Sequence, residues 1–588
     1  MPLRTDIPGC PFPSWIAPPA MAQTPETSTG HTYTVRSLSW TSGLHAGSPE
    51  ESRTRSAETV TFSEPGANWM RLHFGGFNLG PGSFLLITSL LDGAQQRLDQ
   101  TSIEQWNHTS AVFNGSALRV DLHVSPSDEQ AHVSIAELRA GRFSRQADAA
   151  EAGARLLATP LSCNGLDDRV ASADPAVSRN FYDRGTPGSP NFYVGCTSWI
   201  GANGAHLAAG HCGIDRLTMI EFNVPPSGPD GVPVFAHPDD QYPVDLSSIV
   251  TTGSGQAEDW AVFEVFPNSN TGLLPEQVQG GYYRVSNETA TSGNAVRVVG
   301  YGLDAVPAGT GTNPQPGPNA DSQTLQEDVG SFGNSVGTRH SVSEVDIAID
   351  NSGSPMIDVA TNVSMGILTR GGALDVGAWG DVFRIMCSGG GQAFFSQALQ
   401  DALNNLPGTN TVYVDASHPS PTEDGTVFDP YDTLAEGLSN TPAHGTLSIV
   451  EGAYPGTVTI SNPIRITAPV GRVSIGGPGA PASVQPAPAA LAADEARLSV
   501  PSSFMLNGNY PNPFNPDTRI SFSIPETGRV VIVVYNVLGK EVVRLLDRDL
   551  AAGQHTVSFD GAGLPTGPYL YRVGWRDLSV SRMMLLLK

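Results

Sequence analysis

Apolar and polar residues alternate along much of this chain, and the alternation predicts β-strands. It is clearest over residues 118–124 (LRVDLHV), where apolar side chains would take one face of a strand and polar ones the other. Ile520, Phe522 and Ile524 alternate in the same way, and residues 530–535 form the continuous apolar run of a buried strand. The pattern favours short strands over long helices, so we predict a mostly β, multidomain protein.

The composition agrees with this picture and bounds the number of domains. The chain has 588 residues, with 64 glycines, 47 prolines and 15% charged residues, which suits strands joined by turns. A chain of this length is expected to hold about three or four domains, because single cores stop growing well below it. The net charge of −25 argues against nucleic acid and anionic membrane surfaces as partners.

The region before residue 140 carries strand patterns but no chemical motif. We expect residues 31–140 to form a jelly-roll-like β-sandwich, with Trp69, Leu72 and Phe74 in its core. Its histidines lack the spacing of metal ligands. A structural or chaperone-like role and a carbohydrate- or protein-binding role both remain open. Residues 141–162 are expected to be a linker.

Three motifs further along supply a serine nucleophile and the groups that activate it. They are residues 207–212 (LAAGHC), 258–263 (EDWAVF) and 350–355 (DNSGSP). A serine hydroxyl is a weak nucleophile until an imidazole removes its proton, and that imidazole needs a carboxylate on its other nitrogen. We therefore predict His211 as the base, Asp259 as the orienting carboxylate and Ser352 as the nucleophile.

Cysteine spacing supports an exported protein. Cys196 precedes Cys212 by 16 positions, with the turn 201–204 (GANG) between two apolar segments, so we predict a disulfide beside His211. Disulfides imply an oxidising compartment. Cys163 and Cys387 flank the region of the motifs and could form a second pair.

Taken together, residues 163–400 resemble the trypsin-like serine peptidases of bacteria, in the glutamyl endopeptidase-like branch. The matching residues are Cys196, 209–212 (AGHC), 259–263 (DWAVF), 299–302 (VGYG), Asp346, 351–355 (NSGSP) and 366–367 (GI). The resemblance implies a chymotrypsin-like double β-barrel and an acyl-enzyme mechanism that needs no cofactor and no metal. It also implies an oxyanion hole formed by the backbone amides of Asp350 and Ser352.

Two positions depart from that family. Its members usually have glycine at the place of Asp350, so this aspartate could strain the oxyanion hole or place a negative charge near it. Glutamate-selective relatives carry histidine at the place of Leu368. The alternative to a secreted serine endopeptidase is therefore a catalytically impaired homologue that serves as a secreted or surface-displayed binding or adhesion protein.

The expected substrate pocket lies near the same motifs. It comprises Asp346, Leu368, Thr369 and Arg370. Asp346 occupies the place that confers preference for Arg and Lys in trypsin, where a buried carboxylate pairs with a cationic side chain. Aspartate also occurs there in bacterial relatives without that preference, so the sequence leaves the preferred side chain open. Peptides or proteins are the expected substrates.

Two further segments follow the peptidase-like region. Residues 409–477 resemble the opening coils of a right-handed parallel β-helix, too short for a catalytic groove, so we expect a spacer or a weak binding element. Residues 478–498 are rich in proline and alanine and should be a linker. At the other end, residues 1–30 are expected to be a leader or atypical signal region that contains Cys10 and ends near residues 20–22 (AMA).

Residues 499–588 resemble the C-terminal sorting domains of type IX secretion cargo. The matching motifs are residues 506–516 (LNGNYPNPFNP), 534–540 (VYNVLGK), 553–555 (GQH) and 567–572 (GPYLYR). The resemblance implies an Ig-like sandwich, the type IX secretion machinery as a partner, and a place in the medium or on the outer cell surface. No apolar run reaches the length that a membrane span needs.

Overall fold

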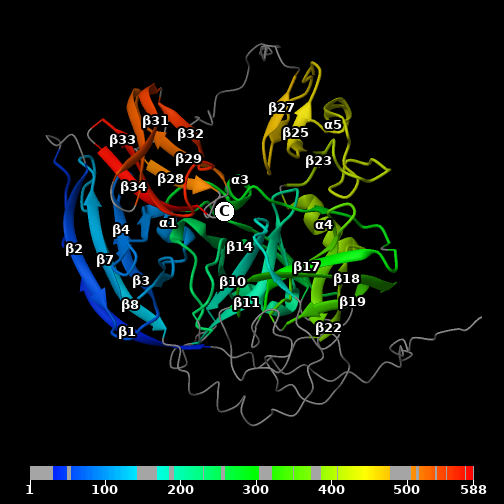
Figure 1. Ribbon diagram of the computed structural model, residues 1–588, viewed down its shortest axis with the longest axis horizontal. Coiled ribbons are helices and arrows are strands. Elements are labelled where there is room, and N and C mark those ends of the chain that lie inside the picture. Colours follow the sequence, from blue (N-terminus) through cyan, green and yellow to red (C-terminus); the bar gives the residue numbers. More distant parts are fainter. Residues whose placement is uncertain are drawn as a thin grey trace, which may run out of the picture. The chain divides into compact units, whose positions relative to one another are not determined.

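In the computed structural model the chain forms two compact units, residues 1–482 and 483–588 (Figure 1). The described residues are 31–48, 54–141, 169–183, 191–228, 231–252, 258–289, 291–302, 321–348, 350–371, 386–406, 408–476, 505–510, 516–536, 540–550, 552–576 and 578–586. The leader 1–30, the linker 478–498, the linker 141–162 beyond its first residue, and Cys163 lie outside them.

The first unit begins with a β-sandwich of eight described strands. They are β1 (His31–Thr41), β2 (Arg55–Ser63), β3 (Trp69–Asn78), β4 (Phe84–Ser89), β5 (Gln95–Leu98), β6 (Phe113–Asn114), β7 (Ala117–Val124) and β8 (His132–Gly141), with helix α1 (Gln100–Gln105) after β5. The sheets have the orders β1-β8-β3-β6 and β2-β7-β4-β5, an order of strands in two four-stranded sheets that is typical of a jelly roll. The alternation in residues 118–124 places the side chains of Leu118, Val120 and Leu122 in the core.

Six described strands then close into a first barrel. They are β10 (Val177–Asp183), β11 (Asn191–Ile200), β12 (His206–Ala208), β13 (Leu217–Glu221), β14 (Gln241–Thr252) and β15 (Trp260–Val265). Their order is β10-β13-β14-β15-β12-β11, and β11 pairs back with β10. The 3-10 helices Gly210–Cys212, Ile214–Arg216 and Pro238–Asp240 and the short helix α3 (Pro275–Val278) lie in its connections.

A second barrel follows, also closed by six described strands. They are β17 (Ala295–Tyr301), β18 (Leu325–Val336), β19 (Arg339–Ile347), β20 (Pro355–Asp358), β21 (Val363–Gly371) and β22 (Met386–Ala393). Their order is β21-β20-β17-β18-β19-β22, closed by β21 and β22, while β9 (Val170–Ala171) extends β18 and β16 (Arg284–Val285) extends β21. Two closed six-stranded barrels confirm the predicted mostly β, chymotrypsin-like fold.

The jelly roll and the first barrel share one apolar core. Trp69 of β3 meets Phe192 of β11 edge to face, with 4.8 Å between ring centroids, and Phe181 and Phe235 belong to the same cluster. Strand β1 also pairs with β11. Because aromatic rings of both parts fill this core, the jelly roll is built into the first unit and is no detachable appendage.

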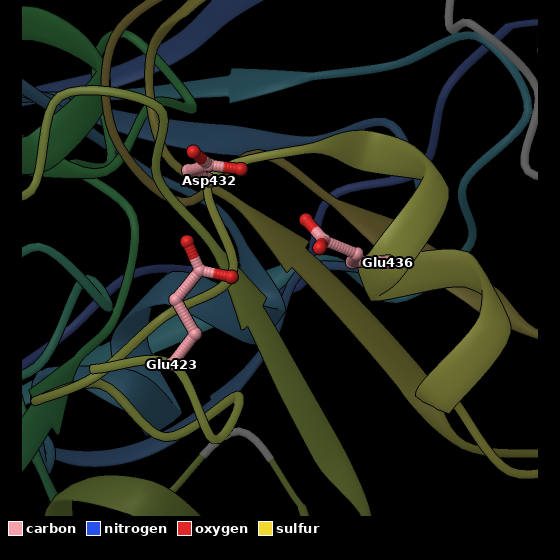
Figure 2. A group of neighbouring side chains, drawn as sticks. All are labelled: Glu423, Asp432 and Glu436. Atoms are coloured by element: carbon pink, nitrogen blue, oxygen red, sulfur yellow. The ribbon is translucent and has the colours of Figure 1, made fainter. Parts of the chain in front are cut away.

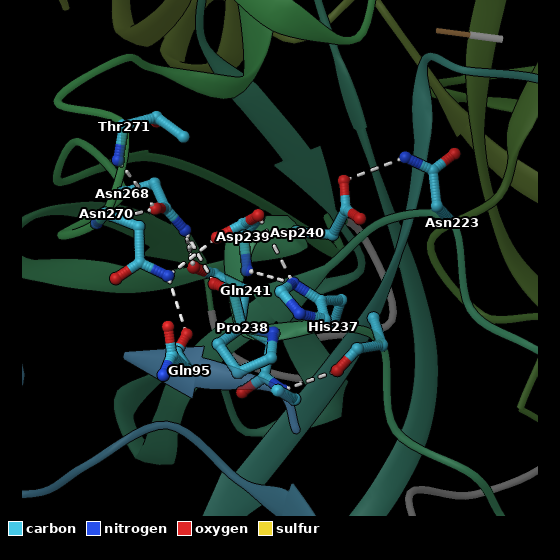
Figure 3. A network of polar contacts seen from close by, with 12 residues as sticks. Gln95, Asn223, His237, Pro238, Asp239, Asp240, Gln241, Asn268, Asn270 and Thr271 are labelled. Carbon is cyan, nitrogen blue, oxygen red and sulfur yellow. Dashed lines mark hydrogen bonds and ion pairs between the residues drawn. The ribbon is translucent and has the colours of Figure 1, made fainter. Parts of the chain in front are cut away.

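Polar side chains tie the same two parts together at another place (Figure 3). Asn270, which follows β15, donates through Nδ2 to the Gln95 carbonyl oxygen at 2.7 Å and to Asp239 Oδ1 at 2.6 Å. Its Oδ1 accepts from the Arg97 amide at 2.6 Å. One side chain therefore joins strand β5 of the jelly roll to the 3-10 helix Pro238–Asp240 of the barrel.

The segment 409–477 lies against the barrels. After helix α4 (Gln397–Asn405), strands β23 (Thr411–Val414), β24 (Thr446–Ile449) and β26 (Arg465–Thr467) pair in parallel, as do β25 (Gly452–Tyr454) and β27 (Val473–Ile475), with helix α5 (Leu434–Asn440) beside them. Tyr413 and Phe428 enter the core cluster that contains Trp199 of the first barrel. Asp415 binds Arg284 through both carboxylate oxygens, at 2.6 and 3.0 Å. The sequence led us to expect a spacer or a weak binding element, and the structure shows that the segment packs into the first unit.

The second unit is a β-sandwich. Strands β28 (Met505–Tyr510), β29 (Asp517–Ile524) and β32 (Gly553–Asp560) form one sheet, and β31 (Glu541–Leu550), β30 (Gly528–Asn536), β33 (Gly567–Trp575) and β34 (Leu578–Leu586) form the other. Ile520, Phe522 and Ile524 point into its core, as their alternation predicted. In the part of the chain that the structure describes, no helix is long and apolar enough to cross a membrane.

Candidate active site

His211, Asp259 and Ser352, which lie far apart in the sequence, come together between the two barrels. His211 Nε2 is 3.0 Å from Ser352 Oγ, and His211 Nδ1 is 2.7 Å from Asp259 Oδ2. The His211 and Asp259 side chains are 15% and 7% exposed. When Nδ1 carries the proton and donates a hydrogen bond to Asp259, Nε2 is left as an acceptor for the serine hydroxyl. This geometry allows His211 to take a proton from Ser352.

The first barrel supplies His211 and Asp259 on neighbouring strand ends. Strand β12 pairs with β15, which brings the 3-10 helix Gly210–Cys212 next to the start of β15. Asp259 also accepts a hydrogen bond from the His211 amide, at 2.9 Å to Oδ1. The predicted disulfide between Cys196 and Cys212 is present and joins β11 to this short helix. The backbone and the ring of His211 are thus held by separate contacts.

The second barrel reaches across to Asp259. The Asp259 amide donates to Gln392 Oε1 at 3.0 Å, and Gln392 Nε2 donates to the carbonyl oxygens of Thr338 and Ala393, each at 3.0 Å. Gln392 lies on β22 and is buried. Sequence reasoning missed this residue, because a lone glutamine after a run of glycines carries no local signal.

The turn that carries Ser352 is held against both barrels. The Ser352 carbonyl oxygen accepts from the Thr197 amide at 2.8 Å, and the Gly353 amide donates to the Leu368 carbonyl oxygen at 2.7 Å. Gly353 has a φ of +97°, and a Cβ there would collide with the Thr197 carbonyl oxygen. Only glycine suits this position. The serine is therefore presented by a turn whose backbone has little freedom.

The predicted oxyanion hole contains one amide without a protein acceptor. Within the part of the chain that the structure describes, the Ser352 amide donates no hydrogen bond. Asp350, the second residue of the predicted hole, has a φ of +76°, in the left-handed region that glycine adopts easily. Its carboxylate is buried and accepts hydrogen bonds from Tyr193 Oη and from Gln323 Nε2.

The residues predicted to line the substrate pocket have different surroundings. Asp346 is 3% exposed at the end of β19, and its amide donates to Asp328 Oδ2 at 2.6 Å. The side chain of Leu368 belongs to the apolar core of the second barrel. On the same strand, Thr369 is buried and Arg370 is exposed. Leu368 therefore lies in the core of the second barrel, and Arg370 lies at the surface.

Three exposed carboxylates gather elsewhere, on the segment 409–477 (Figure 2). The oxygen atoms of Glu423, Asp432 and Glu436 lie within 4.8 Å of one another. All three side chains are exposed, and exposed acidic groups often cluster without a ligand. We assign no metal to them.

Comparison with known proteins identifies one part of the chain. Residues 509–585 match the family described as the secretion system C-terminal sorting domain. A crystal structure of tobacco vein mottling virus protease is similar over 39% of this chain and 82% of its own, with 12% sequence identity and a TM-score of 0.20. No curated protein matches the chain. The C-terminal unit is therefore a type IX sorting domain, and the chain is an exported protein, secreted or carried on the cell surface.

Proposed function

We propose that this protein is a secreted serine endopeptidase that cleaves peptide bonds through His211, Asp259 and Ser352. The observation that carries the proposal is the pair of distances at His211, 3.0 Å to Ser352 Oγ and 2.7 Å to Asp259 Oδ2. A serine, a histidine and a buried aspartate in this order and geometry are the groups that acyl transfer to serine requires. The double-barrel fold and the sorting domain support an exported hydrolase.

The proposed reaction uses only groups of this chain and water. Ser352 Oγ attacks the carbonyl carbon of the scissile bond while His211 Nε2 takes its proton. The negative charge that develops on the carbonyl oxygen is bound by the amides of Ser352 and Asp350. His211 returns the proton to the leaving amine as the C–N bond breaks. A water molecule then attacks the acyl carbon while His211 takes its proton, the bond from the acyl carbon to Ser352 Oγ breaks, and His211 returns the proton to Ser352 Oγ as the acid leaves.

The peptidase region is proposed to span residues 163–400, in the glutamyl endopeptidase-like branch that its motifs resemble. Asp346, Thr369 and Arg370 are proposed to border the substrate pocket, because they lie on the strands that flank the Ser352 turn. Leu368 takes the place of the histidine of glutamate-selective relatives, and its side chain lies in the core. The preferred substrate side chain is therefore best read out from a peptide library.

A fluorophosphonate probe tests the proposal directly. It should label Ser352 in the purified protein, and Ser352→Ala should abolish labelling and lower peptide hydrolysis by about 10⁴- to 10⁶-fold. Ser247→Ala is the matched control, since Ser247 is an exposed strand residue whose Oγ donates to Asp245 Oδ1 and is not paired with a histidine among the described residues. The control should keep both signals. A wild-type protein with neither labelling nor hydrolysis would favour the binding or adhesion protein instead.

A further inference from the structure

The backbone of Asp350 has a conformation that its side chain disfavours. Its φ of +76° lies in the left-handed region, where a side chain is strained and glycine is not. In the proposed mechanism the Asp350 amide is one of two donors to the oxyanion, so its direction matters for catalysis. Something other than intrinsic preference must hold this backbone in place.

The Asp350 side chain provides that hold. It is 7% exposed, and its two oxygens accept from Tyr193 Oη and, at 2.7 Å, from Gln323 Nε2. Gly195 makes the room, because a Cβ there would lie 2.8 Å from both Asp350 Cγ and Tyr193 Oη. Both donors carry partial positive charge, so they also balance a carboxylate that would otherwise oppose negative charge near the oxyanion.

The backbone of Gln323 is held by residues of both barrels. The backbone N–H of Gln323 donates to the Gly302 carbonyl oxygen at 2.7 Å, and the backbone carbonyl oxygen of Gln323 accepts from Arg179 Nη1 at 2.9 Å. Arg179 and Glu221 form a fully buried ion pair at 2.8 Å between β10 and β13. Gln323 and Asp350 both belong to the second barrel, and the contacts that reach them from the first barrel are those of Arg179 to Gln323 and of Tyr193 to Asp350.

We infer that Asp350, Tyr193 and Gln323 form a latch. The latch holds residues 350–353, which carry the two proposed oxyanion donors, in their catalytic conformation. Tyr193 and Gln323 are positioning residues: they act on the reaction only through the Asp350 backbone. The aspartate at the place of the family's glycine is thus a working part of the site and does not impair it. This inference rests on the proposed function, because the latch matters for rate only if Ser352 is acylated.

Steady-state kinetics and hydrogen exchange of the full-length protein test the latch. Tyr193→Phe should lower kcat about tenfold, as expected for one lost hydrogen bond, and Asp350→Ala should lower it by about 100-fold or more. KM should stay within about twofold, because substrate binding does not use the latch. Asp350→Asn should recover at least about tenfold of the kcat that Asp350→Ala loses, since the new side-chain amide can donate to Gln323 Oε1, which is buried and has no hydrogen-bond partner among the described residues.

The matched control is Tyr413→Phe, another buried tyrosine, whose hydroxyl donates to the Leu403 carbonyl oxygen away from the site. It should leave kcat unchanged. Hydrogen exchange of the peptide around Ser352 should accelerate in the double variant Tyr193→Phe/Gln323→Leu and stay as in wild type in Tyr413→Phe.

The outcomes separate the two proposals. A wild-type protein that fluorophosphonate does not label at Ser352 defeats the proposed function, while the exchange measurement still tests the latch. Unchanged exchange around Ser352 in the double variant overturns the latch. The latch is also overturned if the Tyr193 and Asp350 variants change KM at constant kcat, or if Asp350→Asn is as slow as Asp350→Ala.

Discussion

His211 is held by Asp259 through two different atoms, one on its ring and one on its backbone. The contact to the ring determines which nitrogen faces Ser352, and the contact to the backbone amide fixes the position of the residue that carries the imidazole. Five residues earlier in the chain, His206 has a contrasting environment. It is 1% exposed, its ring stacks on Phe263 at 5.5 Å, and neither ring nitrogen has a partner among the described residues. Position in the fold therefore gives two nearby histidines different chemistry.

Burial lowers the pKa of His206 to about 3. In an unfolded chain the pKa of histidine is near 6.5. Between about pH 3 and 6.5, residue 206 is therefore protonated in the unfolded state and neutral in the folded state. The stability that neutral His206 provides is complete above about pH 6.5 and is lost as the pH falls toward 3. Between pH 7 and pH 4 the wild type should lose roughly 3 kcal/mol more than His206→Leu.

Urea denaturation of both proteins at pH 7 and pH 4 measures this difference. Effects of other titrating groups cancel in the comparison, because both proteins share them. Equal losses in the two proteins would show that His206 becomes protonated without unfolding.

Strands β11 and β12 and the short helix after them form the element that carries His211. The disulfide links Cys196 on β11 to Cys212, the residue after His211, and closes a loop of 16 positions. Both cysteines are buried beside Ala208 and Ala209 in the core of the first barrel. The covalent link and the apolar packing therefore act on the same short stretch of backbone.

Removal of this disulfide should weaken the whole element. Cys196→Ser/Cys212→Ser should lower the free energy of unfolding by about 3 kcal/mol, since a loop of this length gains that much freedom in the unfolded chain. The measurement is urea denaturation without reductant. Reduction of the wild type should reproduce the loss and should leave the double variant unaffected. A double variant with the wild-type urea midpoint would contradict the expectation.

The first unit combines the jelly roll, both barrels and the segment 409–477. Tyr413, Val427 and Phe428 share a core cluster with Trp199, and Val450 and Val470 share another with the disulfide. Each large apolar side chain contributes about 1.5–3 kcal/mol when it is buried. We therefore expect the segment to stabilise the barrels, whereas the sorting domain is a unit of its own.

Two truncations should separate these roles. A chain that ends at Ala493 should fold and keep a reactive Ser352 but should no longer leave the cell, because it lacks the sorting domain. A chain that ends at Leu406 should melt at a lower temperature or aggregate, because it exposes the partners of Tyr413 and Phe428. The reactivity of Ser352 is measured by fluorophosphonate labelling, the stability by thermal melting, and the export by assay of the medium.

The longer truncation product provides the control for the shorter one. Appearance in the medium of the chain that ends at Ala493 would show that export does not need residues 499–588. A stable, reactive chain ending at Leu406 would return the segment 409–477 to the role of a spacer.

Much of this protein could be predicted from its sequence, because the relevant patterns are local. Alternation over residues 118–124 depends only on neighbours two positions apart, and the motifs around His211, Asp259 and Ser352 carry their chemistry within six residues each. Their order predicted the double barrel through family resemblance. The cysteine spacing predicted the disulfide for the same reason, since it closes one hairpin.

Only the tertiary structure could decide the surroundings of Asp350. From its sequence position this aspartate is expected to hinder the oxyanion hole, yet its carboxylate is bound by Tyr193, 157 positions away, and by Gln323, 27 positions away. Barrel closure and strand register choose such partners, and no local pattern encodes them. The same holds for the core that Trp69 shares with Phe192 and for the docking of Tyr413, because an apolar residue fits many neighbours and the sequence does not say which one.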